Sequence, residues 1–147
     1  MNHYTSKNFS LTKSIGFQLV KARNIITSEM DVALRDPDIT HQQMGILLSL
    51  KNGLATTPFE LSKLLGIDTG LMTRMLDKLE AKKLLERFRS VDDRRVINLK
   101  LTANGEAIAT QIPEIATPVL NARLKNFTKA EFDELRRLLD KFIGDNP

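Results

Sequence analysis

Basic side chains gather in one quarter of this 147-residue sequence. Residues 69–101 contain nine lysines and arginines against five aspartates and glutamates, a formal charge of +4 that equals the net charge of the whole chain. Arginine presents a fixed fork of N–H donors that fits phosphate oxygens and the O6 and N7 atoms of guanine. This distribution predicts a surface that binds nucleic acid, although a solvated face with internal salt bridges would carry the same charge.

Cysteine and histidine, on which much catalytic and metal-binding chemistry depends, are scarce. The chain has no cysteine, and its two histidines, His3 and His41, are far apart in the sequence. These counts exclude a disulfide framework, a thiolate metal site and a catalytic cysteine. The sequence also lacks a recognisable Ser/His/Asp set or a Gly-rich phosphate loop. We therefore expect a protein that is not an enzyme and that has no cofactor or metal ion.

An amphipathic helix over residues 69–82 is expected to position the basic residues. Asp68 can cap this helix, and a step of 100° per residue gathers the apolar side chains in one arc. We assign that arc to the core; it contains Leu71, Met72, Met75, Leu76 and Leu79. The opposite arc presents Thr73 and Arg74 near the helix start, the arrangement of a helix that lies in the major groove of DNA.

Three residues of the outward arc have different expected roles. Arg74 is the best candidate for reading a base, because its guanidinium can donate two hydrogen bonds to guanine. Thr73 can contact a thymine methyl group or a phosphate. Asp77 would repel phosphates, so we expect it to orient Arg74 or an arginine of the following hairpin, or to accept from a cytosine amine.

The segments on either side complete a small lobe. Thr57, Pro58 and Glu60 predict a capping box with proline at the first helical position, and this helix ends near Gly66. Two short helices joined by such a tight turn form a helix-turn-helix unit. Beyond Leu84, residues 85–91 and 96–101 favour two strands around an acidic and basic tip, which together predict a β-hairpin.

The segment before the lobe predicts two helices. Apolar residues recur at helical spacing from Ile15 to Arg35, and Pro37 ends that pattern. Thr40 can cap a shorter helix that stops at the turn signal Asn52-Gly53.

The segment after the lobe also predicts two helices. Thr102 can cap the first, in which Pro113 and Pro118 are expected to bend or interrupt the turns. Residues 128–131 form a capping box for the last helix, which ends at Gly144. The fold class is therefore mainly α with a small β-hairpin. The outer helices carry more apolar surface than the lobe needs, which favours burial against a second copy over a monomeric helical cap.

Six segments, taken together and in order, resemble the multiple antibiotic resistance regulator (MarR) family of winged helix-turn-helix transcriptional regulators. These segments are ITHQQ at 39–43, ELSKLLGID at 60–68, TRMLDKLE at 73–80, LLER at 84–87, DDRR at 92–95 and KLTANG at 100–105. A lone Asp-Arg-Arg would be weak evidence, whereas the ordered set over about 65 residues is specific.

The resemblance implies a single MarR-type domain over residues 1–147 that forms a homodimer. Residues 9–36 and 103–144 would be dimerisation helices, and residues 40–101 the winged helix-turn-helix lobe. Two lobes would read a pseudo-palindromic promoter site in double-stranded DNA, with helix 69–82 in the major groove and the 85–101 wing in the minor groove. The regulator would act as a repressor, and a small aromatic ligand would release it from the DNA.

The resemblance and the helix arcs together give the candidate site. The expected DNA-binding residues are Thr57, Thr69, Gly70, Thr73, Arg74, Lys78, Arg94 and Arg95. Asp93 would orient the wing, and the helix that starts after Thr57 could hold a phosphate at its amide end. Lys83 departs from the family pattern, because it stands where a glycine usually ends the recognition helix; in a left-handed conformation lysine costs about 1 kcal/mol relative to glycine.

The alternative function is a winged-helix adaptor that binds proteins and has lost DNA reading, but retention of Arg74, Arg94 and Arg95 argues against it. The amino terminus lacks the apolar core of a signal peptide, and the longest apolar stretch is too short to cross a bilayer. We therefore expect a cytoplasmic protein without a membrane partner.

Overall fold

The computed structural model describes residues 1–144, so the last three residues of the expected domain, 145–147, lie outside the described part. In chain order its elements are η1 (Leu11–Lys13), α1 (Ile15–Ala33), α2 (His41–Lys51), α3 (Pro58–Leu65), α4 (Thr69–Ala81), β1 (Leu85–Arg89), β2 (Ile97–Leu101), α5 (Ala103–Leu124) and α6 (Lys129–Ile143). The chain is thus mainly helical with one antiparallel hairpin, as predicted.

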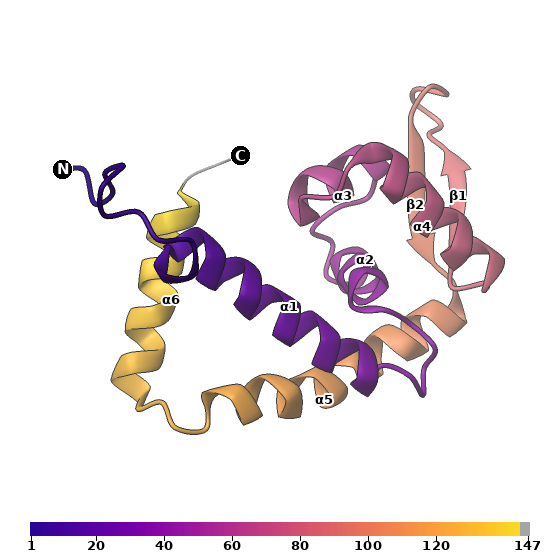
Figure 1. Cartoon of the computed structure of the whole chain (residues 1–147). Helices are drawn as coiled ribbons and strands as arrows, with labels where there is room; N and C mark the ends of the chain where they lie inside the picture. Colours follow the sequence, from indigo (N-terminus) through magenta and orange to yellow (C-terminus); the bar gives the residue numbers. More distant parts are fainter. Residues whose placement is uncertain (145–147) are drawn as a thin grey trace.

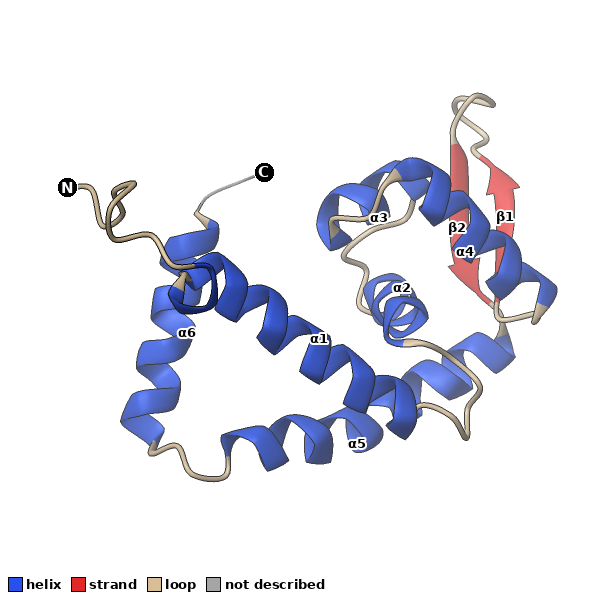
Figure 2. Ribbon diagram, viewed as in Figure 1, coloured by secondary structure: helices blue, strands red, loops and turns tan. Residues whose placement is uncertain are grey.

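The elements divide into a lobe and a set of outer helices (Figure 1). Helices α2, α3 and α4 pack with the hairpin to form the lobe, and α5 leaves its base along α2 and the end of α1. Helix α6 then turns back toward the amino-terminal end of α1 (Figure 2). Within residues 1–144, none of the helices combines the length and apolarity that crossing a bilayer requires.

The predicted caps begin the predicted helices, with one exception. Thr40 forms a capping box with Gln43, and Thr128 forms one with Glu131. The predicted box at residues 57–60 is wrong in one half. The Thr57 hydroxyl accepts from the Glu60 N–H as expected, but the Glu60 carboxylate accepts from the Thr56 N–H at 2.8 Å rather than from Thr57.

Three boundaries or interruptions differ from expectation. Helix α1 ends at Ala33 rather than Arg35. Strand β1 ends at Arg89 rather than Val91, because the Ser90 hydroxyl accepts from the backbone of the next turn. Helix α5 continues without interruption through Pro113 and Pro118.

The core of the lobe is built on α4. Met72, Met75, Leu76 and Leu79 are all buried, and Leu71 is half-buried, which confirms the predicted apolar arc. Burial of each such side chain contributes about 1.5–3 kcal/mol, so the arc fixes the rotation of α4 about its own axis. The side of α4 that carries Thr73 and Arg74 must then face outward.

The start of α5 packs closely against the residues that follow α4. Thr102 donates its N–H to the carbonyl of Leu84 at 3.1 Å and its hydroxyl to the carbonyl of Lys83 at 2.6 Å. A Cβ atom added at Gly105 would lie 1.9 Å from the Leu84 carbonyl oxygen. Glycine is therefore required at this position, because two backbones meet there.

Replacing Gly105 by alanine should lower the free energy of unfolding by about 1–3 kcal/mol, because backbone atoms must shift to admit the methyl group. Urea denaturation at fixed protein concentration measures the change. Gly16→Ala is the matched control: that glycine is also helical and its added Cβ has nothing within 4 Å. A Gly105→Ala variant as stable as the wild type would contradict the close approach.

Candidate nucleic-acid interface

Helix α4 carries most of the predicted DNA-binding residues on its exposed side. Asp68 caps the helix by accepting from the N–H groups of Gly70 and Leu71. Thr69, Gly70, Thr73, Arg74 and Lys78 are all exposed. The structure therefore places these five residues together on one solvent-facing arc.

The side chains at the start of α4 have defined surroundings. The Thr73 hydroxyl donates to the Thr69 carbonyl at 2.9 Å, so its methyl group and oxygen lone pairs are left for an outside partner. This arrangement favours an apolar contact with a thymine methyl over donation to a phosphate. A Cβ at Gly70 would lie 4.0 Å from Nη1 of Arg74 and 3.3 Å from the Asp68 carboxylate, so the small residue leaves room for the guanidinium beside the cap.

The N-terminus of α3 has fewer free N–H groups for binding a phosphate than a helix N-terminus usually offers. Pro58 has no N–H, and the N–H of Glu60 is already bonded to the half-buried Thr57. These two features reduce the donors that α3 can offer to a phosphate. Thr57 itself lies at the predicted position, as the cap of the helix.

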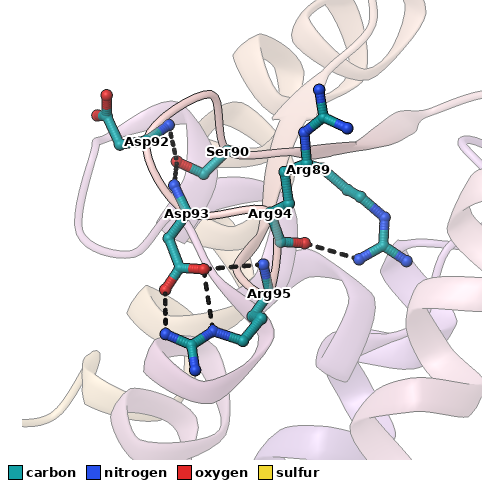
Figure 3. A network of polar contacts seen from close by, with 6 residues as sticks. All are labelled: Arg89, Ser90, Asp92, Asp93, Arg94 and Arg95. Carbon is teal, nitrogen blue, oxygen red and sulfur yellow. Dashed lines mark hydrogen bonds and ion pairs between the residues drawn. The ribbon is translucent and has the colours of Figure 1, made fainter.

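The hairpin projects beyond the lobe, with residues 90–96 at its tip (Figure 1). Its register runs from Leu85 opposite Leu101 to Arg89 opposite Ile97. At the tip, the Ser90 hydroxyl accepts from the N–H groups of Asp92 and Asp93, and Arg89 donates to the Arg94 carbonyl at 2.7 Å (Figure 3). The tip is therefore held by its own polar groups.

Asp93 and Arg95 form a two-point pair within the tip (Figure 3). The Asp93 carboxylate accepts from the Arg95 side chain at 3.2 and 3.4 Å and from the Arg95 backbone N–H at 3.0 Å. The side-chain hydrogen bonds, followed by the backbone bond, lower the pKa of Asp93. The Arg95 side chain is 92% exposed, so the pair orients Arg95 at the surface without burying it. Arg94 is also exposed.

Asp77 pairs with an arginine of the hairpin, which decides among the three partners that the sequence left open. Nη2 of Arg87 lies 2.7 Å from Oδ1 of Asp77 and 3.5 Å from the Thr73 carbonyl oxygen. Nη1 of Arg87 lies 3.5 Å from Oε1 of Glu80. Sequence reasoning did not single out Arg87, although strand alternation places it on the same side as Leu85, the side that packs against α4.

Helix α4 ends on a left-handed lysine. Lys82 is the C-cap residue, and Lys83 has a φ of 59°. The Lys83 N–H donates to the Glu80 carbonyl and the Leu84 N–H to the Leu79 carbonyl, which is the Schellman arrangement usually completed by glycine. Lysine at this position, where the family usually has glycine, therefore keeps the geometry of the cap. The left-handed backbone is strained there, because lysine has a Cβ atom and glycine does not.

A helix-turn-helix followed by a hairpin, with basic residues exposed on both, defines the winged helix-turn-helix class of proteins. The MarR family model matches residues 39–97. The multiple antibiotic resistance protein MarR of Escherichia coli strain K12 is 39% identical over 107 residues, which cover 72% of this chain and 74% of the relative. The chain belongs to the MarR family.

One further relative and one solved structure agree with this membership. The HTH-type transcriptional regulator SarZ of Staphylococcus aureus is 27% identical over 140 residues, covering 95% of this chain and 93% of SarZ. The crystal structure of a mutant E. coli MarR complexed with operator DNA superposes with a TM-score of 0.82 at 31% identity, covering 92% of this chain and all of the other. The chain is therefore a member of a family of transcriptional regulators rather than of an enzyme family.

Replacing Lys83 by glycine should raise the free energy of unfolding by about 1 kcal/mol, because it removes the Cβ that is crowded at positive φ. Thermal and urea unfolding measure this gain. Lys83→Ala is the control, since it removes the ammonium group but keeps the Cβ, and we expect no such gain. Equal stability of the glycine and alanine variants would show that the backbone strain is relieved in another way.

Proposed function

We propose that the protein is a homodimeric, sequence-specific regulator of transcription that binds double-stranded DNA and acts as a repressor in the cytoplasm. One observation carries the proposal: Arg74 stands on the exposed arc of α4, while Arg94 and Arg95 stand exposed at the tip of the hairpin packed beside that helix. Two exposed basic elements on one lobe fit the major groove and the adjacent minor groove.

In this proposal each site residue has its own contact. Arg74 reads a guanine, Thr73 contacts a thymine methyl group, and Lys78 neutralises a phosphate. Thr69 and Gly70 let the start of α4 approach the groove closely, and Thr57 sets a phosphate contact at the start of α3. Arg94 and Arg95 enter the minor groove, where negative potential is concentrated, and Asp93 holds Arg95 in the orientation that entry requires.

A second copy of the chain is the proposed partner of the outer helices. Helix α6 buries none of its residues within the protomer, although Phe132, Leu135, Leu138 and Phe142 lie along it. A hollow of about 820 Å³, lined largely by apolar side chains, separates α6 from the start of α1. In the proposed dimer, residues 9–36 and 103–144 form the shared interface and residues 40–101 remain the DNA-binding lobe of one domain.

A crevice between α1 and the lobe is the proposed site of a small aromatic acid that releases the DNA. The crevice measures about 500 Å³ and brings Arg23 of α1 together with His41, Gln42 and Leu71 of the lobe. Arg23 offers a cation to a carboxylate, and apolar walls suit an aromatic ring. A ligand held between α1 and the lobe would change the angle of the lobe and so the spacing of two recognition helices.

His41 joins the two sides of this crevice. Its Nδ1 and its backbone N–H both lie within 2.9 Å of Oδ1 of Asp31 in α1. Desolvation raises the pKa of Asp31, but the hydrogen bonds from the His41 backbone and ring outweigh it, so the pKa is lowered overall. Nε2 of His41 is buried and has no hydrogen-bond partner within the described chain.

Replacing Arg74 by alanine should weaken binding to the cognate site by about 1–3 kcal/mol and relax its sequence preference. Arg95→Ala should weaken binding mainly at A·T-rich flanks. Fluorescence anisotropy with a duplex from the intergenic DNA upstream of the protein's own gene, at several salt concentrations, measures both; log affinity should fall by about 0.9 per phosphate contact as log salt rises.

Lys7→Ala is the control for this experiment, because Lys7 is an exposed basic residue outside the lobe and outside the proposed dimer interface. Its affinity should equal that of the wild type. Equal affinity of the wild type, Arg74→Ala and Arg95→Ala for the upstream duplex would overturn the DNA-binding proposal and favour the adaptor alternative.

Sodium salicylate, used as a probe aromatic acid, should lower the affinity for the duplex, and Arg23→Gln should reduce that response. The variant should bind DNA normally without salicylate, because Arg23 lies in the crevice and not on the exposed arc of α4. Lys7→Gln serves as the matched control and should respond like the wild type, because Lys7 is exposed and lies outside the crevice. An undiminished response in Arg23→Gln would place the effector elsewhere.

A further inference from the structure

Arg87 occupies a position between the two elements of the candidate interface. It lies in the middle of β1, and its side chain is 25% exposed, far less than the arginine at the hairpin tip. Its two terminal nitrogens contact Asp77 and Glu80, which lie about one turn apart on α4. The guanidinium is therefore engaged with α4 on two sides.

The Asp77 carboxylate would oppose DNA binding if it were unpaired. It lies on the exposed arc of α4 between Arg74 and Lys78, and its side chain is 60% exposed. A negative charge next to the residues that approach phosphates repels those phosphates. Nη2 of Arg87 lies 2.7 Å from this carboxylate and offsets its negative charge.

The same arginine also ties the hairpin to the helix. Arg87 donates to Asp77 from the middle of β1, and Arg89 donates to the Arg94 carbonyl at the end of the strand. The tip arginines are thus connected to α4 through one short strand that carries both polar contacts. Movement of the tip relative to α4 would require breaking one of these contacts.

We propose that Arg87 is a positioning residue for DNA binding: it masks the Asp77 carboxylate and sets the hairpin against the recognition helix, and it makes no contact with DNA itself. This inference rests on the proposed DNA-binding function. The competing role for Arg87 is direct contact with a phosphate, which its charge alone would also allow.

The two roles predict different behaviour of a neutral pair. Arg87→Gln alone leaves Asp77 unpaired and should weaken binding to the upstream duplex by about tenfold or more, the effect of removing one partner of a charge pair. Asp77→Asn/Arg87→Gln has the net charge of the wild type, and its two amide side chains can still hydrogen-bond between α4 and β1, so it should recover most of the lost affinity. Asp77→Asn alone should bind at least as well as the wild type.

The salt dependence gives a second, independent readout. In Asp77→Asn/Arg87→Gln the slope of log affinity against log salt should match that of the wild type. If Arg87 contacts a phosphate, the slope of the double variant should instead be smaller by about 0.9 and its affinity should stay as low as that of Arg87→Gln. Either of these two results would overturn the inference.

Lys100→Gln is the matched control for loss of a hairpin cation. Lys100 is exposed on β2, and its ionic partner is Glu86 of the hairpin rather than a residue of α4. Its loss should not be rescued by Asp77→Asn. Should Arg87→Gln fail to fold, the comparison of Asp77→Asn with Asp77→Asn/Arg87→Gln decides alone, because near-equal affinities support masking and a large difference refutes it.

The outcome also separates this inference from the proposed function. A wild-type protein that does not bind the upstream duplex or any duplex enriched from a random pool contradicts the function itself. A wild type that binds, together with a double variant as weak as Arg87→Gln, contradicts the role of Arg87 and leaves the function standing.

Discussion

Burial of one side of α4 is the interaction on which the rest of this structure depends. Met72, Met75, Leu76 and Leu79 pack inward, and the apolar area they remove from water fixes how α4 is rotated. Every outward residue of the helix takes its direction from that rotation. The exposed position of Arg74 is therefore a consequence of packing, and no hydrogen bond to Arg74 is needed to explain it.

The hairpin depends on the same helix but through charge as well as packing. Leu85 and Leu99 of the hairpin are buried, while the side chain of Arg87 contacts the carboxylates of α4. At the far end, Asp93 and Arg95 use hydrogen bonds within the tip itself. The interface therefore combines an apolar base, which sets the position of the hairpin, with a polar tip, which sets the direction of its side chains.

Most of the fold could be predicted from the sequence, because its signals are local. Helical periodicity, threonine caps and a period-two strand pattern identified each helix of the lobe and the hairpin, and the arc of α4 followed from the same periodicity.

The partner of Asp77 could not be predicted, since the sequence left Arg74, an arginine of the hairpin and a cytosine amine open, and the choice depends on the tertiary packing of β1. The half-formed box at Thr57 was missed for a related reason: the Glu60 carboxylate can reach two neighbouring N–H groups, and local pattern does not rank them.

The bare apolar side of α6 has a consequence for how such a regulator would respond to its own abundance. If two protomers must meet to cover that side, the concentration of dimers competent to occupy a palindrome rises with the square of the protomer concentration when copies are few. Synthesis and dilution at cell division would then set a threshold for repression, below which the promoter escapes control. In this way an exposed apolar helix face that does not touch the DNA would make repression depend steeply on the number of protein molecules in the cell.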